Sequence, residues 1–216
     1  MYVSKHHELS DIEAAQGLIE AHPLGAWVVA GGEGLIANHV PFFLDRSRGE
    51  FGTLCGHVAR ANPIWRVLSS AADSVVMFVG PQSYITPGWY PGKQEHGKVV
   101  PTWNYAVAHA HGAARAIDDE AWLRNLLHRL TATHEAPQQT PWKVSDAPPQ
   151  FIDSLVRAVV GIEIPIDRLV GKLKASQDEA LQDRLGTVAG LKARGDANAA
   201  AVARLVQQAV EQGTVA

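Results

Sequence analysis

The sequence has a single cysteine, Cys55, among its 216 residues. One cysteine cannot form a disulfide within the chain, which is typical of proteins in a reducing cytoplasm. No stretch approaches the run of about 20 apolar residues that a membrane-spanning helix needs. The N-terminal residues MYVSKHHELSD also lack the apolar segment of a signal peptide. We therefore expect a soluble, cytoplasmic protein with no membrane partner.

Excess positive charge is also missing. The formal net charge is −3 and the pI is about 6.3, so nothing draws the whole chain to nucleic acid. No Lys/Arg cluster and no helix-turn-helix spacing with a basic recognition helix occurs, which counts against direct reading of DNA. The sequence also lacks GxSxG, Walker A, HExxH and Rossmann glycine patterns, and with them the usual signals of several enzyme classes.

The hydrophobic pattern predicts a mainly β protein with flanking helices. Extended segments are expected at 26–30, 35–45, 50–58, 74–80, 99–117 and 161–177, and helices at about 11–21, 62–69, 119–134, 148–159 and 197–212. A Gly-rich turn at 31–34 joins the first two strands. The order is not an alternation of strand and helix, so a parallel doubly wound sheet is not favoured. About six antiparallel strands with outside helices indicate a closed or split barrel.

A window from Phe51 to Ala72 contains Arg60 and Arg66 but no acidic residue. In this window a strand ends and a short helix is expected to begin at Asn62-Pro63. Free N–H groups at that helix start, the helix dipole and Arg60 together would form a phosphate site, with His57 as a further donor. The alternative is that the two arginines only solvate a surface helix and that Asn62 only caps it.

Aromatic residues gather between positions 81 and 112, among small polar side chains. Rings mixed with hydrogen-bonding groups suit a flat heteroaromatic ligand, although an aromatic barrel wall would give the same pattern. The rings belong to Tyr84, Trp89, Tyr90, Trp103 and Tyr105. His109 and His111 would point the same way on a strand, but no third metal ligand has a recognisable spacing, and we predict no metal site.

Several of these segments resemble one protein family. The runs MYVSKHHE, ANHVPFFLD, GTLCGHVARANP, GPQSYITPGWYP, PWKVSDAP, GIEIPI and GKLKASQ, and above all KQEHGKVVPTWNY (93–105), look like the PaiB-type FMN-binding negative transcriptional regulators. The resemblance covers residues 1 to about 190. It implies an FMN-binding split β-barrel domain over 1–177 and a C-terminal helical extension over 178–216. It also implies a homodimer with FMN in a cleft at the subunit interface.

The resemblance also implies roles for individual residues. Arg60 would pair with the FMN phosphate, with His57 and Asn62 as further donors. Asn38 and His39 match positions that contact the ring edge or the ribityl chain. Trp103, Asn104 and Tyr105 match a wall of the cleft that the partner subunit could supply. Lys174 and Gln177 belong to the family's KxSQ segment, which is expected near the cleft. This chain has Asp178 where the family often has Asn.

Three functions remain open from the sequence. The first is a flavin-sensing negative transcriptional regulator with a DNA or protein partner. The second is a flavin-dependent oxidoreductase similar to NAD(P)H:flavin reductases, because a flavin takes up one or two electrons. The third is a haem-handling protein, since the chain has ten histidines. No acid/base pair stands out, so no catalytic residue is named and the enzymatic question stays open.

Overall fold

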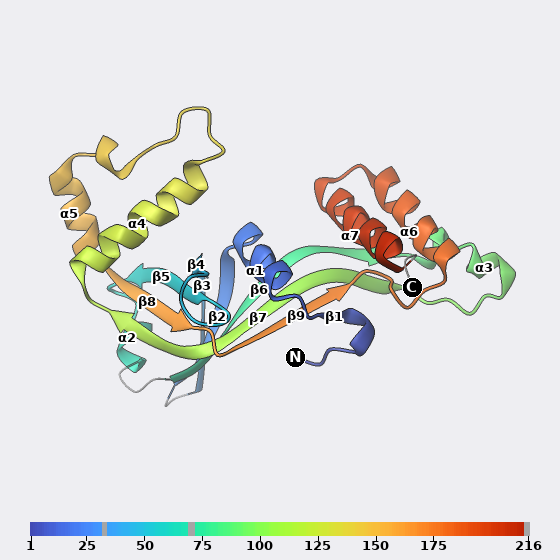
Figure 1. Cartoon of the computed structure of the whole chain (residues 1–216), viewed down its shortest axis with the longest axis horizontal. Coiled ribbons are helices and arrows are strands. Elements are labelled where there is room, and N and C mark those ends of the chain that lie inside the picture. The colour runs from blue at the N-terminus through green and yellow to red at the C-terminus, as the bar shows by residue number, and fades with distance from the viewer. Residues whose placement is uncertain (32–33, 69–71, 214–216) are drawn as a thin grey trace. The chain divides into compact units, whose positions relative to one another are not determined.

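The computed structural model describes residues 1–31, 34–68 and 72–213. The chain forms two compact units (Figure 1). The first unit comprises Met1–Leu18, Val79–Ala108 and Val170–Ala216, and the second unit comprises Ile19–Phe78 and His109–Leu169. Helix α1 (Ile12–Ala21) and the strands β6 (Ala72–Ile85), β7 (Thr102–Ile117) and β9 (Arg168–Lys174) contribute residues to both units.

Antiparallel strands form most of the second unit. In it β2 lies between β3 and β6, while β5 pairs with β4 and β8, and β8 also pairs with β7. The strands are β2 (Leu24–Gly31), β3 (Gly34–Pro41), β4 (Phe43–Asp45), β5 (Thr53–Ala59) and β8 (Val159–Pro165). The short α2 (Ile64–Val67), then α4 (Glu120–Glu135), the 3-10 turn η3 (Val144–Asp146) and α5 (Pro149–Arg157) complete the unit.

Burial alternates from residue to residue along β2 and β3, so this part of the sheet has a buried inner face and an exposed outer face. Trp27 on β2 lies opposite Asn38 on β3 and Val76 on β6, and directly opposed residues share one face of a sheet. On this inner face Trp27 and Phe78 are completely buried, and Phe42 packs edge-on against both rings. The core of the second unit therefore lies on the Trp27 side of β2, and the opposite side is the outer face.

The first unit ends in a helical hairpin, α6 (Leu181–Arg194) and α7 (Ala197–Gly213), and it also contains η1 (Lys5–His7), β1 (Glu8–Leu9), η2 (Pro87–Trp89) and α3 (Gly92–Glu95). Gly195 ends α6 with φ +74°, a conformation that favours glycine. The Trp89 ring packs on α6 so closely that a Cβ on Gly190 would lie 2.2 Å from it. Val188, Leu191, Val202 and Val206 form the buried seam between the two helices.

The mainly antiparallel architecture with flanking helices is confirmed, with some differences of detail. The expected strand 35–45 is two strands, β3 and β4, separated at Phe42, whose N–H donates to the Pro23 carbonyl. Only one helix was expected after residue 178, and α6 is additional. Residues 32–33 of the predicted turn and Ser69, the predicted end of the helix that begins at Asn62, lie outside the described residues. The boundary at 177/178 stays a prediction.

A buried carboxylate ties two strands of the second unit, β7 and β8, to the loop between β4 and β5. Glu163 on β8 is only 1% exposed, and both its oxygens accept hydrogen bonds from guanidinium groups, one from Arg48 and one from Arg115 on β7 (2.7 Å from Nε). Burial alone would raise the pKa of Glu163, but these bonds outweigh it and lower the pKa. Cys55 faces Glu163 across the β5–β8 pair, and burial raises the pKa of its thiol to about 11. The thiol is therefore a packed, unreactive group at neutral pH.

We predict that Glu163→Gln lowers the free energy of unfolding at neutral pH by about 2 kcal/mol, because two guanidinium groups would then face a neutral amide. Because folding lowers the pKa of Glu163, its contribution is present above the carboxylate's ordinary pKa and is lost as the pH falls through the folded-state pKa. Denaturant unfolding at several pH values measures this. The control is Glu20→Gln, which breaks the exposed pair with Arg46 and should cost less than about 1 kcal/mol. Equal costs would contradict the assignment.

Candidate functional site

The corner between β5 and α2 holds two of the predicted cofactor residues in direct contact. Asn62 Nδ2 donates to Asn38 Oδ1 at 2.8 Å, and Asn62 Oδ1 accepts from the Ile64 N–H at 3.0 Å. The turn is closed by the Asn62 N–H, which donates to the Ala59 carbonyl. The Asn62 side chain therefore forms a turn just ahead of α2 and fixes the Asn38 amide on the inner face of β3. The N-cap of α2 is Pro63 rather than Asn62, so the predicted cap lies one residue too early.

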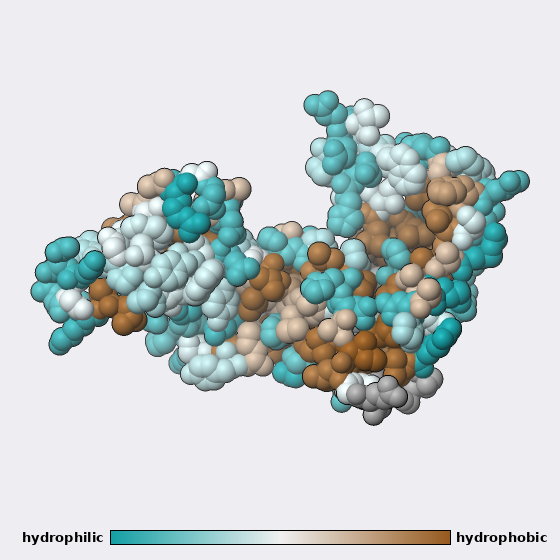
Figure 2. All heavy atoms as spheres, turned by 180° about the vertical axis from the view of Figure 1, so that it is seen from behind, coloured by the Kyte–Doolittle hydropathy of each residue, from teal (hydrophilic) through white to brown (hydrophobic). Residues whose placement is uncertain are grey.

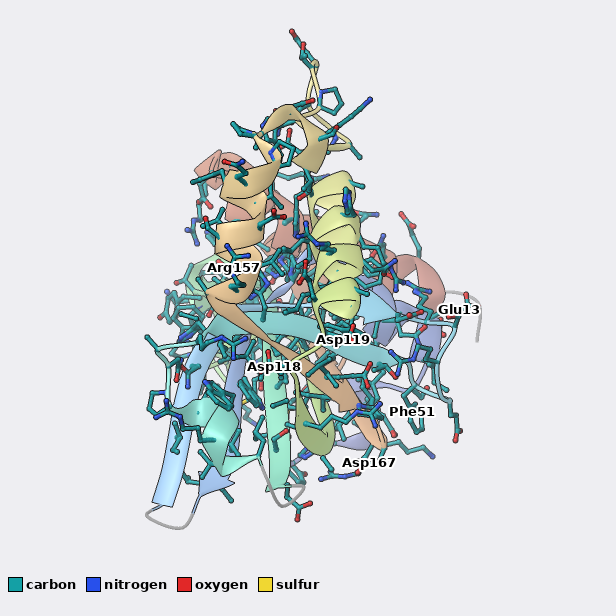
Figure 3. The ribbon with its side chains drawn as sticks, turned by 90° about the vertical axis from the view of Figure 1, so that its left-hand side faces the viewer. Glu13, Phe51, Asp118, Asp119, Arg157 and Asp167 are labelled. Carbon is teal, nitrogen blue, oxygen red and sulfur yellow. The ribbon has the colours of Figure 1, made fainter. Side chains whose placement is uncertain are left out.

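Arg60 has partners within the protein that the sequence did not indicate. Its guanidinium donates to both carboxylate oxygens of Asp118 (2.5 and 3.0 Å) and to the carbonyls of Arg157 (2.8 Å) and Val159 (3.0 Å). This pairing lowers the pKa of Asp118. Figure 3 shows Asp118 just before the start of α4 and Arg157 at the end of α5. Arg60 thus joins the β5 corner to both helices, and its contact with the FMN phosphate stays a prediction.

Arg66 is the other cation of this stretch. It lies on α2, is exposed, and stacks over the Trp65 ring at 5.2 Å from the ring centroid. Among the described residues no carboxylate forms an ion pair with Arg66, so an anionic ligand would not have to displace one. The indole N–H of Trp65 donates to the Arg60 carbonyl at 3.0 Å, which links the helix to the corner. Arg66 was not among the predicted site residues, although it lies in the same acid-free window.

The two predicted histidines lie on different surfaces. His57, half-buried on β5, lines a pocket beneath α4 and α5, and its Nδ1 is buried with no hydrogen-bond partner among the described residues. Burial lowers the pKa of His57, so the ring is neutral at neutral pH and retains one donor and one acceptor. His39 is exposed on the outer face of β3, opposite Ala26. Their roles toward FMN stay predictions.

The other five predicted residues belong to the first unit, at the start of β7 and the end of β9. The Lys174 ammonium donates to the Thr102 hydroxyl and to the Trp103 carbonyl. Asn104 is fully buried, its Nδ2 donates to Ser176 Oγ at 2.8 Å, and its Oδ1 has no partner among the described residues. Within this unit the structure therefore brings the WNY and KxSQ segments together.

The remaining members of this group have distinct environments. Trp103 is 52% exposed, and the Tyr84 ring meets it edge-on at 6.2 Å. The Lys172 ammonium lies 5.4 Å from the centroid of the Tyr105 ring. Gln177 accepts from the Ala175 N–H and donates to the Leu173 carbonyl, so its side chain closes the turn that follows β9. Ser176, in that turn, has φ +59°, which is unusual for a residue other than glycine.

These observations fit a flavin in part. The exposed Trp103 indole offers a stacking face, whereas Asn104 is completely buried in the single chain. Arg66, in the second unit, forms no ion pair among the described residues and suits a phosphate. The Lys174 ammonium, in the first unit, is bonded to Thr102 and Trp103 and interacts electrostatically with Glu179. Arg60 fits less well, because a phosphate would have to compete with Asp118.

The rings of His109 and His111 lie 6.5 Å apart, and within the described ranges no group of three or more His, Cys, Asp or Glu side chains is placed to hold a metal ion. In the same residues, no helix is both long and apolar enough to cross a membrane.

Comparison with solved structures defines the fold class. The flavocytochrome Anf3 from Azotobacter vinelandii superposes with a TM-score of 0.57 at 13% identity, over 80% of this chain and 72% of that one. At this identity the likeness concerns the fold alone. The antiparallel sheet, open rather than closed, and its flanking helices are those of the flavin split barrel, as the sequence predicted.

Sequence comparison then gives the family. Residues 1–168 match the family model FMN_bind_2, described as "Putative FMN-binding domain", and the chain belongs to this family. An Emericella nidulans protein, AN0679, is 34% identical over 96% of this chain and 97% of its own length. Protease synthase and sporulation protein PAI 2 of Bacillus subtilis (strain 168) is 26% identical over 98% of this chain and 99% of its own. The predicted resemblance to PaiB and the predicted cofactor, FMN, are thereby confirmed.

The phosphate role of Arg60 can be tested against its observed pairing. If Arg60 binds the phosphate, Arg60→Ala raises the dissociation constant for FMN by about tenfold or more, while Asp118→Asn, which frees the guanidinium, does not weaken binding. Fluorescence titration of the apoprotein with FMN measures both, and circular dichroism checks folding. If both variants lose stability and neither changes the affinity, Arg60 only joins strand and helices.

Proposed function

We propose that this chain is a cytoplasmic FMN-binding homodimer of the PaiB type, acting as a negative transcriptional regulator or flavin sensor. The observation that carries the proposal is the likeness to the Bacillus subtilis PAI 2 protein, which extends over 98% of this chain and includes the segments that contribute the candidate site. The single, buried Cys55 is in keeping with a reducing compartment. The partner of such a regulator would be DNA or a regulatory protein.

The homodimer is supported by the outer face of the β3-β2-β6 sheet. The side chains that point outward on these strands are almost all apolar: Leu24, Ala26, Val28, Ala30, Leu35, Ala37, Pro41, Val75 and Met77. Leu35 is 79% exposed and Leu24 is 59% exposed in the single chain. Figure 2 shows a broad area of hydrophobic residues on the side turned away from the viewer in Figure 1. A continuous apolar sheet face of this kind needs a cover, and a second copy would bury it against its own equivalent.

Two ionisable side chains of the described residues point outward on these strands, Asp73 towards one end of β6 and His39 on β3. His39 has Ala26 opposite it on β2 and Met77 beyond on β6. In the proposed dimer it would lie at the subunit interface, where the family resemblance puts the flavin. Asn38, its neighbour, points to the inner face and contacts Asn62. We assign His39 to the flavin ring edge or ribityl chain, and the WNY and KxSQ segments to the wall of the cleft. The Asn38 side chain points to the opposite face of β3, so its predicted flavin contact is not part of this arrangement.

In this site the chain's residues would bind and orient, and the flavin when bound would supply one- or two-electron chemistry. The Trp103 indole gives a stacking surface, and Arg66 is available to neutralise a phosphate. No carboxylic acid with a raised pKa lies among the assigned residues, and the neutral His57 lines a different surface. The assigned residues therefore support binding and sensing better than acid/base catalysis.

A flavin-dependent oxidoreductase is the second candidate. It is favoured by the exposed aromatic pair Tyr84 and Trp103, whose faces are suited to stacking a nicotinamide beside the flavin. One solved neighbour of similar fold is named a flavocytochrome. Haem binding, the third function suggested by the sequence, is therefore also worth testing.

The dimer proposal predicts that Leu35→Glu gives a monomer, because a carboxylate would have to be desolvated in the apolar interface. Analytical ultracentrifugation should show the wild type as a dimer and the variant at half that mass. The matched control is Leu181→Glu on α6, an exposed leucine of the first unit that is not part of this face, which should stay dimeric. A wild-type protein that is monomeric at all accessible concentrations would refute the assignment of this face.

The regulatory proposal predicts a protein that is yellow as purified, that releases FMN on denaturation, and whose flavin is not bleached by NADH or NADPH under anaerobic conditions. Visible spectroscopy and mass spectrometry of the released cofactor test this. Operator DNA binding is then measured at low and high salt, because phosphate contacts weaken with salt. Rapid anaerobic bleaching would favour the oxidoreductase, and a Soret band on adding haem would favour the haem-binding function.

A further inference from the structure

The second unit contains a pocket that is lined by only one of the predicted cofactor residues, His57. Its volume is about 440 Å³, and it lies between the β5–β8 strands, α4, α5 and the segment that joins the two helices. Figures 1 and 3 show α4 and α5 rising side by side from the sheet. The principal lining side chains are His57, Leu127, Thr131, Trp142, Ile152 and Val159. A second hollow of about 340 Å³ shares His57, Leu127, Thr131 and Trp142 with it and leads to His134 and Glu135.

The chemistry of the walls limits what this pocket can hold. Hydrocarbon side chains form most of the lining, and the polar members are His57 and Thr131. No Asp, Glu, Lys or Arg lines the 440 Å³ pocket, so a charged ligand would lose its hydration without gaining a partner. The volume matches that of pockets for small organic molecules. Three cations, Arg60, Lys143 and Arg157, are adjacent in sequence to lining residues, but none of them lines the pocket itself. An FMN phosphate would therefore find no cationic partner inside it.

The polar groups that line the pocket are a histidine ring and a threonine hydroxyl. His57 Nδ1 is buried and has no partner among the described residues, so the other ring nitrogen, Nε2, is the one that would bond a ligand. Burial lowers the pKa of His57, and the neutral ring can accept a hydrogen bond at one nitrogen. The Thr131 hydroxyl, on α4, is the other group that a ligand could bond. A neutral ligand with one hydrogen-bonding group would match this arrangement.

The rim of the pocket exposes large apolar side chains. Trp142 is 44% exposed and Leu155 is 45% exposed. The loop that carries Trp142 is held in place, because its N–H donates to Glu135 Oε2 at 2.9 Å. The helices are also fixed relative to each other, by the Arg124–Asp153 ion pair and, at the base, by Arg60. The pocket is therefore preformed, and an occupant would cover the exposed rim.

We propose that this pocket is a second ligand site, separate from the flavin, which binds a neutral aromatic molecule with one hydrogen-bonding group directed to His57. In a flavin sensor such a molecule is an effector, and in an oxidoreductase it is bound apart from the flavin. The site does not depend on which of these functions the protein has.

Isothermal titration calorimetry of the FMN-loaded protein with 2-naphthol, a neutral bicyclic phenol, tests the proposal. We expect saturable one-to-one binding. Ala158→Trp, which fills the pocket from an exposed position at its edge, should weaken binding by about tenfold or more. The matched control is Ala121→Trp, an exposed alanine on α4 that lines neither pocket, and it should bind as the wild type does. His57→Leu should weaken binding by about threefold to tenfold through loss of one hydrogen bond.

A readout that needs no variant is the NMR spectrum of the wild type, in which the His57 ring signals should shift on saturation with 2-naphthol. The proposal is overturned if 2-naphthol does not bind saturably, or if Ala158→Trp binds it as tightly as the wild type. It is also overturned if 2-naphthol and FMN displace each other, because the pocket would then belong to the flavin. Retention of FMN by Ala158→Trp, measured separately, distinguishes this failure from a failure of the flavin assignment.

Discussion

The outer face of the β3-β2-β6 sheet is the constraint on which the rest depends. Its outward side chains are aliphatic almost without interruption, and apolar surface exposed to water costs about 25 cal/mol per Å². The inner face is already filled by Trp27, Phe42 and Phe78, so the strands cannot turn this surface inward. A second copy of the chain is the cover that we propose. His39, which stands within the face, then becomes an interface residue, and the flavin cleft becomes a property of two chains.

Polar interactions hold the other strands and helices of the second unit together. Glu163 is held by two arginines between strands, and Arg60 joins the end of β5 to the start of α4 and the end of α5. Both are buried or multiply bonded groups, so removing one partner leaves the other without compensation. The Arg60 contacts also hold α4 and α5 at the base of the apolar pocket. Arg60, which was predicted to bind the phosphate, thus has a structural role within the single chain.

The sequence predicted the strands and the cofactor well because both leave local signals. Apolar runs bounded by Gly or Pro mark β2 and β6, and the KQEHGKVVPTWNY motif is specific enough to indicate an FMN-binding family. What it missed is non-local. Asp118 lies 58 residues from Arg60, so an acid-free window suggested an unpaired arginine where the fold supplies a carboxylate. Helix α6 contains Gly186 and Gly190, which weaken a helical pattern. Both glycines lie against Trp89, where a larger side chain would clash, and this contact is not visible in the sequence. The pocket at His57 arises from four separate segments and has no sequence signature.

The central claim is that two copies of the chain complete the flavin site. Sedimentation velocity of the FMN-loaded protein over a dilution series, recorded at the visible absorption band of the flavin and in the ultraviolet, tests it most directly. The account predicts that bound flavin sediments only with the dimer and that monomer formed on dilution carries none. A monomer that sediments with a full complement of FMN would contradict it.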